Sequence, residues 1–215
     1  MEIDHIFIFS TAAGHEADEL AALGFVEGSS RRHPGQGTTN RKFYCENFFL
    51  EILWVVDYAE LTSERLRTTQ LRQRASFHQT GTSPFGLCLV NTPDTDALFA
   101  EAVTYQPAYF PPGKTIEVLP NQHRPGLPWT FRLPFTGTQT TPAEPLQHPN
   151  GIQRLTRTEF EIQGLPAHDP FVTHFQHEQA LTFEPAAATR LRLTFDHHRQ
   201  RREQQLASLP LLIRY

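Results

Sequence analysis

The 215-residue sequence predicts an α+β protein with mixed or antiparallel sheets rather than a doubly wound parallel fold. Three observations predict this class. Strand-like segments outnumber helix-like ones, turns of hairpin length join successive strands, and a β-α-β unit begins three times, near residues 3, 84 and 152. Parallel sheets need a long crossover between strands, so short connections favour α+β. The three units repeat in structure without obvious sequence identity.

The first unit, residues 1–58, is expected to follow the order β-α-β-β-β. IDHIFIF at residues 3–9 is rich in Ile and Phe, which favour strands. HEADELAAL at residues 15–23 places apolar residues on one side of a helix, and Gly24 is a natural C-cap. Three further strands are expected at FVEGSS, RKFYCE and FFLEILWVVD, with the breaker-rich loop RRHPGQGTTN after the first of them.

The remaining chain is expected to divide into five parts. A connecting segment at 59–83 contains a helix from Ser63 to about His78. A second β-α-β unit at 84–135, a polar Pro-rich loop at 136–150, a third unit at 151–198 and an ambiguous tail at 199–215 follow. The helices of the second and third units are expected at TPDTDALFAEAV and DPFVTHFQHEQ, and their strands at FGLCLVN, KTIEVL, WTFRLPF, GIQRLTRTEFEIQG, ALTFEP and TRLRLTFD.

Composition limits the function classes. The formal net charge of −4 gives no basic field for nucleic acid or an anionic membrane, and no segment has the roughly 20 apolar residues that a spanning helix needs. The N-terminus lacks the features of a signal peptide. Cys45 and Cys88 lie in apolar strand-like runs, which predicts buried free thiols and a cytoplasmic protein.

Glu51 is the first candidate functional residue, because it lies in the apolar strand NFFLEILWVV. Strand alternation puts Phe49 and Leu53 on its face and apolar residues on the other, so the strand should be covered on both sides. A buried carboxylate must be protonated, hydrogen-bonded, paired or bound to metal. One interpretation is an ion pair with a cation such as Arg41. The other is a pocket, with Glu51 as metal ligand or general base.

His5 is the second candidate. It shares a strand face with Phe7 and Phe9, and a lone histidine there is more often a satisfied core residue than a ligand. Its position on the first strand of the unit whose last strand carries Glu51 favours a functional role. If those strands curve into a half-barrel, both side chains can point into its mouth.

These residues resemble a known family. DHIFIF, a helix ending LGF, GTTNRKF and FFLEILW are similar, in this order, to glyoxalase-like members of the vicinal oxygen chelate superfamily, and HPNG at 148–151 resembles a turn of the same branch. The clear resemblance covers residues 2–57. It implies repeated βαβββ modules, forming curved mixed sheets around a cup-shaped pocket with a divalent-metal site, with the third unit completing the cup. Superfamily chemistry includes lysis, isomerisation, ring-opening dioxygenation and non-catalytic drug binding, as in bleomycin resistance.

The resemblance implies three protein ligands for a metal, and the second half departs from it. Phe85 or Gly86 stands where His5 would be repeated, and neither has a ligating side chain. The third ligand is left among Glu159, Glu161, His123 and His148, and we take His148 as the working candidate, with loop capping as its alternative role. A divalent metal (Zn, Ni, Mn or Fe) is therefore expected with His5, Glu51 and His148, or is absent.

The loop HPGQGTTN and two tryptophans supply the candidate substrate-binding residues. Gly35 and Gly37 would let backbone approach a ligand closely, although ordinary turn chemistry explains them equally well. The candidate residues of the mouth and of an apolar wall are Thr38, Asn40, Arg41, Trp54 and Trp129.

The resulting hypothesis is a metal-dependent lyase or isomerase, or a dioxygenase-type enzyme, acting on a small molecule, with Glu51 as the catalytic base if no metal binds. The alternative is a non-catalytic small-molecule binding protein that uses the same pocket, and a purely structural domain is the third option. Nucleic-acid and membrane partners are not expected, and a homodimer is left open.

Overall fold

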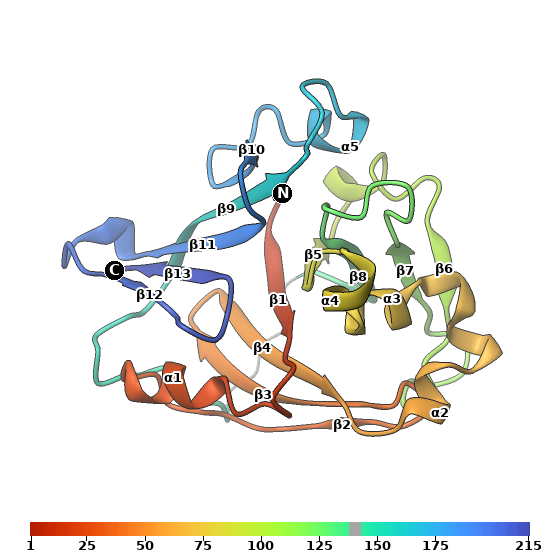
Figure 1. The fold of residues 1–215 in the computed structure, drawn as a ribbon, viewed down its shortest axis with the longest axis horizontal. Helices are drawn as coiled ribbons and strands as arrows, with labels where there is room; N and C mark the ends of the chain where they lie inside the picture. The colour runs from red at the N-terminus through yellow and green to blue at the C-terminus, as the bar shows by residue number, and fades with distance from the viewer. Residues whose placement is uncertain (138–142) are drawn as a thin grey trace.

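The computed structural model describes residues 1–137 and 143–215, which form two β-sheets with a few short helices (Figure 1). The larger sheet has eight strands in the order β2-β3-β4-β1-β5-β8-β7-β6, and the smaller has five in the order β10-β9-β11-β13-β12. Both sheets contain parallel and antiparallel pairs. The predicted α+β class with curved mixed sheets is confirmed.

The larger sheet contains β1 (Ile3–Phe9), β2 (Arg32–His33), β3 (Thr38–Cys45), β4 (Phe48–Val55), β5 (Phe85–Asn91), β6 (Val103–Tyr105), β7 (Ile116–Leu119) and β8 (Trp129–Thr136). The smaller contains β9 (Leu155–Gln163), β10 (Leu181–Ala186), β11 (Arg190–Phe195), β12 (Glu203–Gln205) and β13 (Leu211–Arg214). The α-helices are α1 (Ala17–Ala22), α2 (Tyr58–Leu61), α3 (Leu71–Ala75), α4 (Phe77–Thr80) and α5 (Pro170–Thr173), and the 3-10 turns are η1 (Glu64–Thr69), η2 (Pro93–Thr95) and η3 (Asp196–His198).

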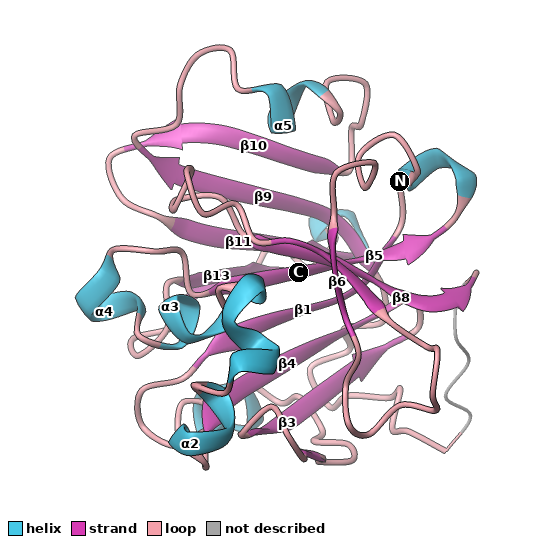
Figure 2. Ribbon diagram, turned by 90° about the vertical axis from the view of Figure 1, so that its right-hand side faces the viewer, coloured by secondary structure: helices cyan, strands magenta, loops and turns pink. Residues whose placement is uncertain are grey.

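The two halves of the larger sheet repeat one arrangement. β1 and β5 pair antiparallel at the centre, β4 is parallel to β1, and β8 is parallel to β5. Beyond each of these, two antiparallel strands continue outward, β3 and β2 on one side and β7 and β6 on the other. The sheet curls so that its two halves face each other across a concave side, where α2, α3 and α4 also lie (Figures 1 and 2).

Strand alternation separates two cores. On β1, Phe7 and Phe9 face the concave side and pack with Leu53 and Trp129, together with Leu61 of α2. On the opposite face the buried side chains of β1, β4 and β5 join those of the smaller sheet in one cluster, which includes Ile6, Ile8, Leu50, Phe160 and Leu193. Both faces of β4 are therefore covered, as the sequence predicts.

The helix predicted from Ser63 to His78 is wrong as a continuous element. Gln70 has a left-handed backbone (φ 59°) between η1 and α3. Trp129 explains this break, since its indole Nε1 donates a hydrogen bond of 2.7 Å to the carbonyl oxygen of Thr69. Arg74, fully buried in α3, donates to the carbonyl oxygens of Pro120, Pro125 and Leu127 and thereby fixes the helical segment to the loop before β8.

Other local predictions also differ from the structure. Residues 25–30 form no strand, because Val26 N–H bonds His148 rather than a neighbouring strand, and the second short strand is β2. The helix expected at 92–103 is reduced to η2 and turns, whose bonds run mostly to the third residue along the chain. The helix expected at 169–179 shrinks to α5, and the ambiguous tail forms β12 and β13. Residues 138–142 of the predicted 136–150 loop lie outside the described residues. None of the helices described has the length and apolar character needed to cross a membrane.

Candidate functional site

A cavity of about 150 Å³ opens on the concave side of the larger sheet. Side chains of β1, β3, β4 and β8 line it, and residues 109 and 110 of the loop before β7 close over it. Of the residues that the sequence nominates, His5, Asn40, Glu51 and Trp129 lie here together.

Three neighbouring side chains hold the His5 ring in place. Its Nδ1 lies 2.5 Å from Asp4 Oδ1, and its ring stacks on Phe49 at 4.3 Å and meets the edge of Phe131. A β-bulge makes the contact with Asp4. Ile3 pairs with Leu89 and His5 with Cys88, so β1 has one extra residue, Asp4, between two residues that are adjacent on β5. Such a bulge re-aims side chains, and here it brings two consecutive residues to one place.

Glu51 is 5% exposed and has polar neighbours at both oxygens. Asn40 Nδ2 donates to Oε1 at 2.5 Å, and Oε2 lies 3.9 Å from His5 Nε2. The amide oxygen of Asn40 accepts from the backbone N–H of Arg31 at 2.7 Å, which fixes the orientation of the amide. The carboxylate is thus held through one oxygen, while the other lies beside the imidazole in the cavity lining.

Thr38 lies beneath the pocket rather than in it. Its hydroxyl is shared by His33 Nδ1 and Gln36 Nε2, both at 2.9 Å, and these two residues line the cavity. Tyr109 donates to Gln36 Oε1 at 3.0 Å and so ties the covering loop to the β2–β3 turn. Burial lowers the pKa of His33 and raises that of Tyr109.

The lining has two chemically different sides. All but one of the strongly polar lining residues precede residue 52: His5, Arg31, His33, Gln36, Asn40, Lys42 and Glu51. From residue 53 onward the lining is aliphatic or aromatic, with Tyr109 as the exception: Leu53, Leu71, Phe110, Ile116, Trp129, Phe131 and Leu133. The first half of the sheet therefore supplies the polar chemistry, and the second half supplies most of the apolar surface.

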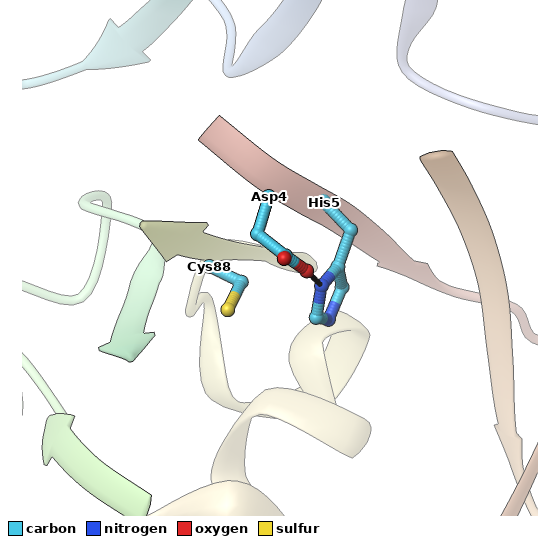
Figure 3. A group of neighbouring side chains, drawn as sticks. All are labelled: Asp4, His5 and Cys88. Atoms are coloured by element: carbon cyan, nitrogen blue, oxygen red, sulfur yellow. Dashed lines mark hydrogen bonds and ion pairs between the residues drawn. The ribbon is translucent and has the colours of Figure 1, made fainter. Parts of the chain in front are cut away.

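A second group of potential metal ligands shares His5. Asp4, His5 and Cys88 bring one ligand atom each within 4.8 Å of one another, at the bulge between β1 and β5 (Figure 3). Burial raises the pKa of the Cys88 thiol well above its usual value. Cys88 is therefore a thiol in the absence of a cation, since burial disfavours the charged form.

Arg41 and Trp54 are not at the cavity. The guanidinium of Arg41 forms ion pairs with Asp18 at 2.7 Å and Glu27 at 2.6 Å, on the opposite face of β3. The ring of Trp54 lies against Gly14, so close that a Cβ there would overlap it. Neighbouring strand residues point to opposite faces, so the pocket-facing residue next to Asn40 is Lys42 rather than Arg41.

His148 does not join His5 and Glu51. Its Nδ1 accepts a hydrogen bond from Val26 N–H at 3.0 Å, and its Nε2 lies 2.8 Å from the carbonyl oxygen of Tyr44. Both ring nitrogens are thereby occupied by main-chain groups, next to the ring of Phe25. These contacts hold the loop at His148, and neither ring nitrogen faces the cavity.

Sequence reasoning missed several lining residues. Lys42 could have been found by extending the alternation Thr38, Asn40 along the strand. His33 and Gln36 belong to the loop that the sequence singled out for its glycines. Tyr109 had no local signal, because its partner Gln36 lies 73 positions away.

A larger cavity of about 500 Å³ lies between the start of β1 and β9. Its arginines are already paired within the protein, Arg154 with Glu46 at 3.3 Å and Arg157 with Glu159 at 3.2 Å. It contains none of the nominated residues. Buried titratable groups converge at the smaller cavity, which is therefore the candidate site.

Comparison with known proteins bears on the fold and the family. A family model described as a glyoxalase-like domain matches residues 3–175. A solved structure of a hypothetical protein from Staphylococcus aureus has a TM-score of 0.58 at 10% identity, covering 99% of this chain and 98% of its own, which shows the fold alone.

Two further solved structures are more distant. A hypothetical protein from Bacillus halodurans has a TM-score of 0.38 at 12% identity, over 65% of this chain and 96% of its own. A xylose isomerase-like TIM barrel/4-hydroxyphenylpyruvate dioxygenase fusion protein has a TM-score of 0.49 at 10% identity, over 90% of this chain and 36% of its own. No curated protein sequence matches this chain.

Proposed function

The chain belongs to the glyoxalase-like domain family, within the vicinal oxygen chelate superfamily, and from this premise we propose that it is a lyase or isomerase that moves a proton on a small molecule. The observation that supports this is the buried pair of His5 and Glu51, which line the cavity with Nε2 and Oε2 3.9 Å apart. Each is held by its own partner, Asp4 or Asn40. Proton transfer is the reaction that this pair can support directly, with Glu51 as a base and His5 facing it.

Glu51 would be the base. A carboxylate only accepts hydrogen bonds, so Asn40 holds Oε1 and Oε2 is the oxygen that can take a proton from carbon. On an α-hydroxy ketone, Oε2 would remove the proton from the hydroxyl-bearing carbon, and the C–H electron pair would move towards the carbonyl oxygen to give an enediolate. The isomer forms when the hydroxyl proton passes to the former carbonyl oxygen, a transfer that His5 Nε2 could carry, and Glu51 returns its proton to the former carbonyl carbon. No co-reactant is consumed.

His5 would serve the same step from the other side. Asp4 accepts at Nδ1, so the proton of the neutral imidazole lies on Nδ1 and Nε2 faces Glu51. A charged imidazole would instead carry a second proton at Nε2 and could donate it to the oxygen that becomes negative. Aromatic stacking on Phe49 keeps the ring in place for either role.

A divalent metal fits part of this site. Asp4 behind His5 is the arrangement that orients metal-bound histidines, and His5 Nε2 and Glu51 Oε2 are the atoms that would hold the ion. With such an ion bound, Glu51 Oε2 would be a ligand rather than the free base, and the ion would act as a Lewis acid for the substrate oxygen. We propose these two residues as the protein ligands, without His148, and the group of Asp4, His5 and Cys88 as the competing set.

Proton exchange tests the catalytic proposal. We expect the protein to exchange the proton beside the carbonyl of small α-hydroxy ketones, hydroxyacetone and 1-hydroxy-2-butanone among them, for deuterium in D2O, followed by proton NMR. Glu51→Gln should lower the rate by a factor on the order of 100 or more, because a positioned base typically contributes that much. Glu64→Gln is the matched control, since Glu64 is exposed on η1. Binding of these ketones without exchange would instead support the non-catalytic alternative.

Metal analysis tests the ligand set. Stoichiometric Zn, Ni, Mn or Fe that is lost in both His5→Ala and Glu51→Ala, and kept in Cys88→Ala, would support the pocket site. Loss in Cys88→Ala with retention in Glu51→Ala would move the metal to the bulge. Failure to take up any of these ions under every loading condition would count against a metal, and Glu51 would act as a base alone.

A further inference from the structure

Resting on the function proposed above, we propose that the ligand of this pocket is a compact carboxylic acid with a cyclic or branched apolar body. The acid group would bind at the edge where Lys42 and Arg31 line the cavity, and the body would lie against the aromatic side. In the part of the chain that the structure describes, neither cation has a carboxylate partner, and the rest of the lining is mainly aromatic and aliphatic.

Lys42 reaches the pocket without a carboxylate partner. Its backbone faces Glu51 in the β3–β4 register, yet its ammonium lies over the rings of Tyr44, at 5.3 Å, and Phe49, at 5.8 Å. Among the described residues no carboxylate oxygen lies within 4.0 Å of it, and Glu144 interacts with it only at longer range. Residues 138–142 contain no Asp or Glu, so they cannot supply the missing partner.

Among the residues with described positions, Arg31 also lacks a carboxylate partner. Its backbone N–H is used by Asn40, while its guanidinium lies 4.6 Å above the ring of Tyr109 in the covering loop. It forms no ion pair within the described part of the chain. A planar guanidinium on an aromatic face keeps its edge available for a carboxylate.

The charge balance of the lining favours an anion. Arg31 and Lys42 carry two positive charges against the single carboxylate of Glu51, which leaves one positive charge in a molecule whose formal net charge is −4. Arg31 is exposed and Lys42 is half-buried, so the proposed place for the acid group is the rim of the pocket.

The rest of the ligand must be apolar and small. On the side opposite Glu51, the hydrogen-bond donors of the two polar aromatics are already used, Trp129 Nε1–H by the Thr69 carbonyl oxygen and Tyr109 O–H by Gln36 Oε1. A hydrogen-bond acceptor placed there would lose its hydrogen bonds to water without a donor to replace them. The cavity of about 150 Å³ is also well below the roughly 300–1,000 Å³ of pockets for drug-sized ligands.

The test compares two probes of nearly the same shape, the anion cyclohexanecarboxylate and the neutral cyclohexanecarboxamide. Of the two tryptophans, Trp129 lines the pocket and Trp54 does not, so Trp54→Phe leaves fluorescence that reports the pocket alone. We expect the acid to bind at least 10-fold more tightly than the amide at low salt. Lys42→Gln and Arg31→Gln should each reduce this preference at least 3-fold, and Lys114→Gln, which removes the same charge outside the lining, should keep it.

Three outcomes would contradict the inference. Equal binding of acid and amide, or a preference that survives both substitutions together, would overturn it while leaving the pocket as the proposed site. Binding of neither probe would overturn the inference and also count against the pocket on which the proposed function rests. Saturation-transfer NMR with the unsubstituted protein gives the same comparison if Trp54→Phe impairs folding.

Discussion

The buried histidines differ in how much of the ring the protein itself uses. His148 gives both nitrogens to main-chain groups, with Val26 N–H donating to Nδ1. His5 donates from Nδ1 to Asp4 and turns Nε2 towards Glu51 in the cavity lining. A ring whose two nitrogens hold backbone in place is a structural element, whereas one that presents a nitrogen to a cavity can perform chemistry.

His148 should therefore make stability depend on pH. Burial lowers the pKa of His148 below its usual value of 6.5. As the pH falls below 6.5, His148 therefore binds a proton in the unfolded chain but not in the folded chain. The contribution is fully present above pH 6.5 and is lost towards the lowered pKa, at no more than about 1.4 kcal/mol per pH unit for one proton.

Urea unfolding at pH 7.5 and 5.5 would measure this effect. The loss of unfolding free energy on acidification should be smaller in His148→Ala than in the unsubstituted protein, because the variant lacks this proton uptake. His123→Ala, at an exposed histidine, should keep the full loss. An identical loss in all three proteins would contradict the prediction. His33, whose pKa is also lowered by burial, contributes equally to each of them.

At the scale of elements, β5 explains why the second half of the sheet lacks a repeat of His5. Gly86 faces Phe7 on β1 and Trp129 on β8, and a Cβ on Gly86 would overlap the Phe7 ring. An aromatic ring from the first half thus occupies the space that a side chain of the second half would need. The pocket is consequently apolar on that side.

Gly86→Ala tests this packing. The added methyl should force the Phe7 ring to move and lower the unfolding free energy by about 1–3 kcal/mol, as overpacking of a core does. Phe7→Leu shortens the neighbour, so the double variant should recover part of the loss made by Gly86→Ala. Urea unfolding of the four proteins gives the coupling free energy. Strict additivity would show that Phe7 is not the side chain that Gly86 accommodates.

The predictability of each element follows from the range of its interactions. β1, β4 and β5 were predictable because alternation and Ile, Phe and Leu content are local properties, and Glu51 was noticed as an exception to that pattern. The break at Gln70 was not, because Trp129 binds the preceding carbonyl from 60 positions away. The same applies to His148, which reaches Val26 over 122 positions.

In the whole molecule, the two sheets share one core while the pocket has another. Cys45 lies in the cluster between the sheets and Cys88 in the cluster beneath the pocket, and both are buried free thiols, as the sequence predicts. Burial raises the pKa of Cys45 to about 12 and that of Cys88 well above its usual value. Neither thiol should react with a thiol reagent until the protein opens.

The reaction rates of the two thiols then report whether the molecule opens as one unit. β1 contributes Ile6 and Ile8 to one core and Phe7 and Phe9 to the other, so neither core can open far without disturbing the same strand. In Cys45→Ala and Cys88→Ala, the remaining thiol should therefore label with an opening free energy equal to that variant's unfolding free energy in urea. A Cys45 that labels with a much smaller opening free energy than its variant's unfolding free energy would mean that the smaller sheet separates first. The pocket would then keep its shape without the second layer, and the His5–Glu51 site would depend on the larger sheet alone.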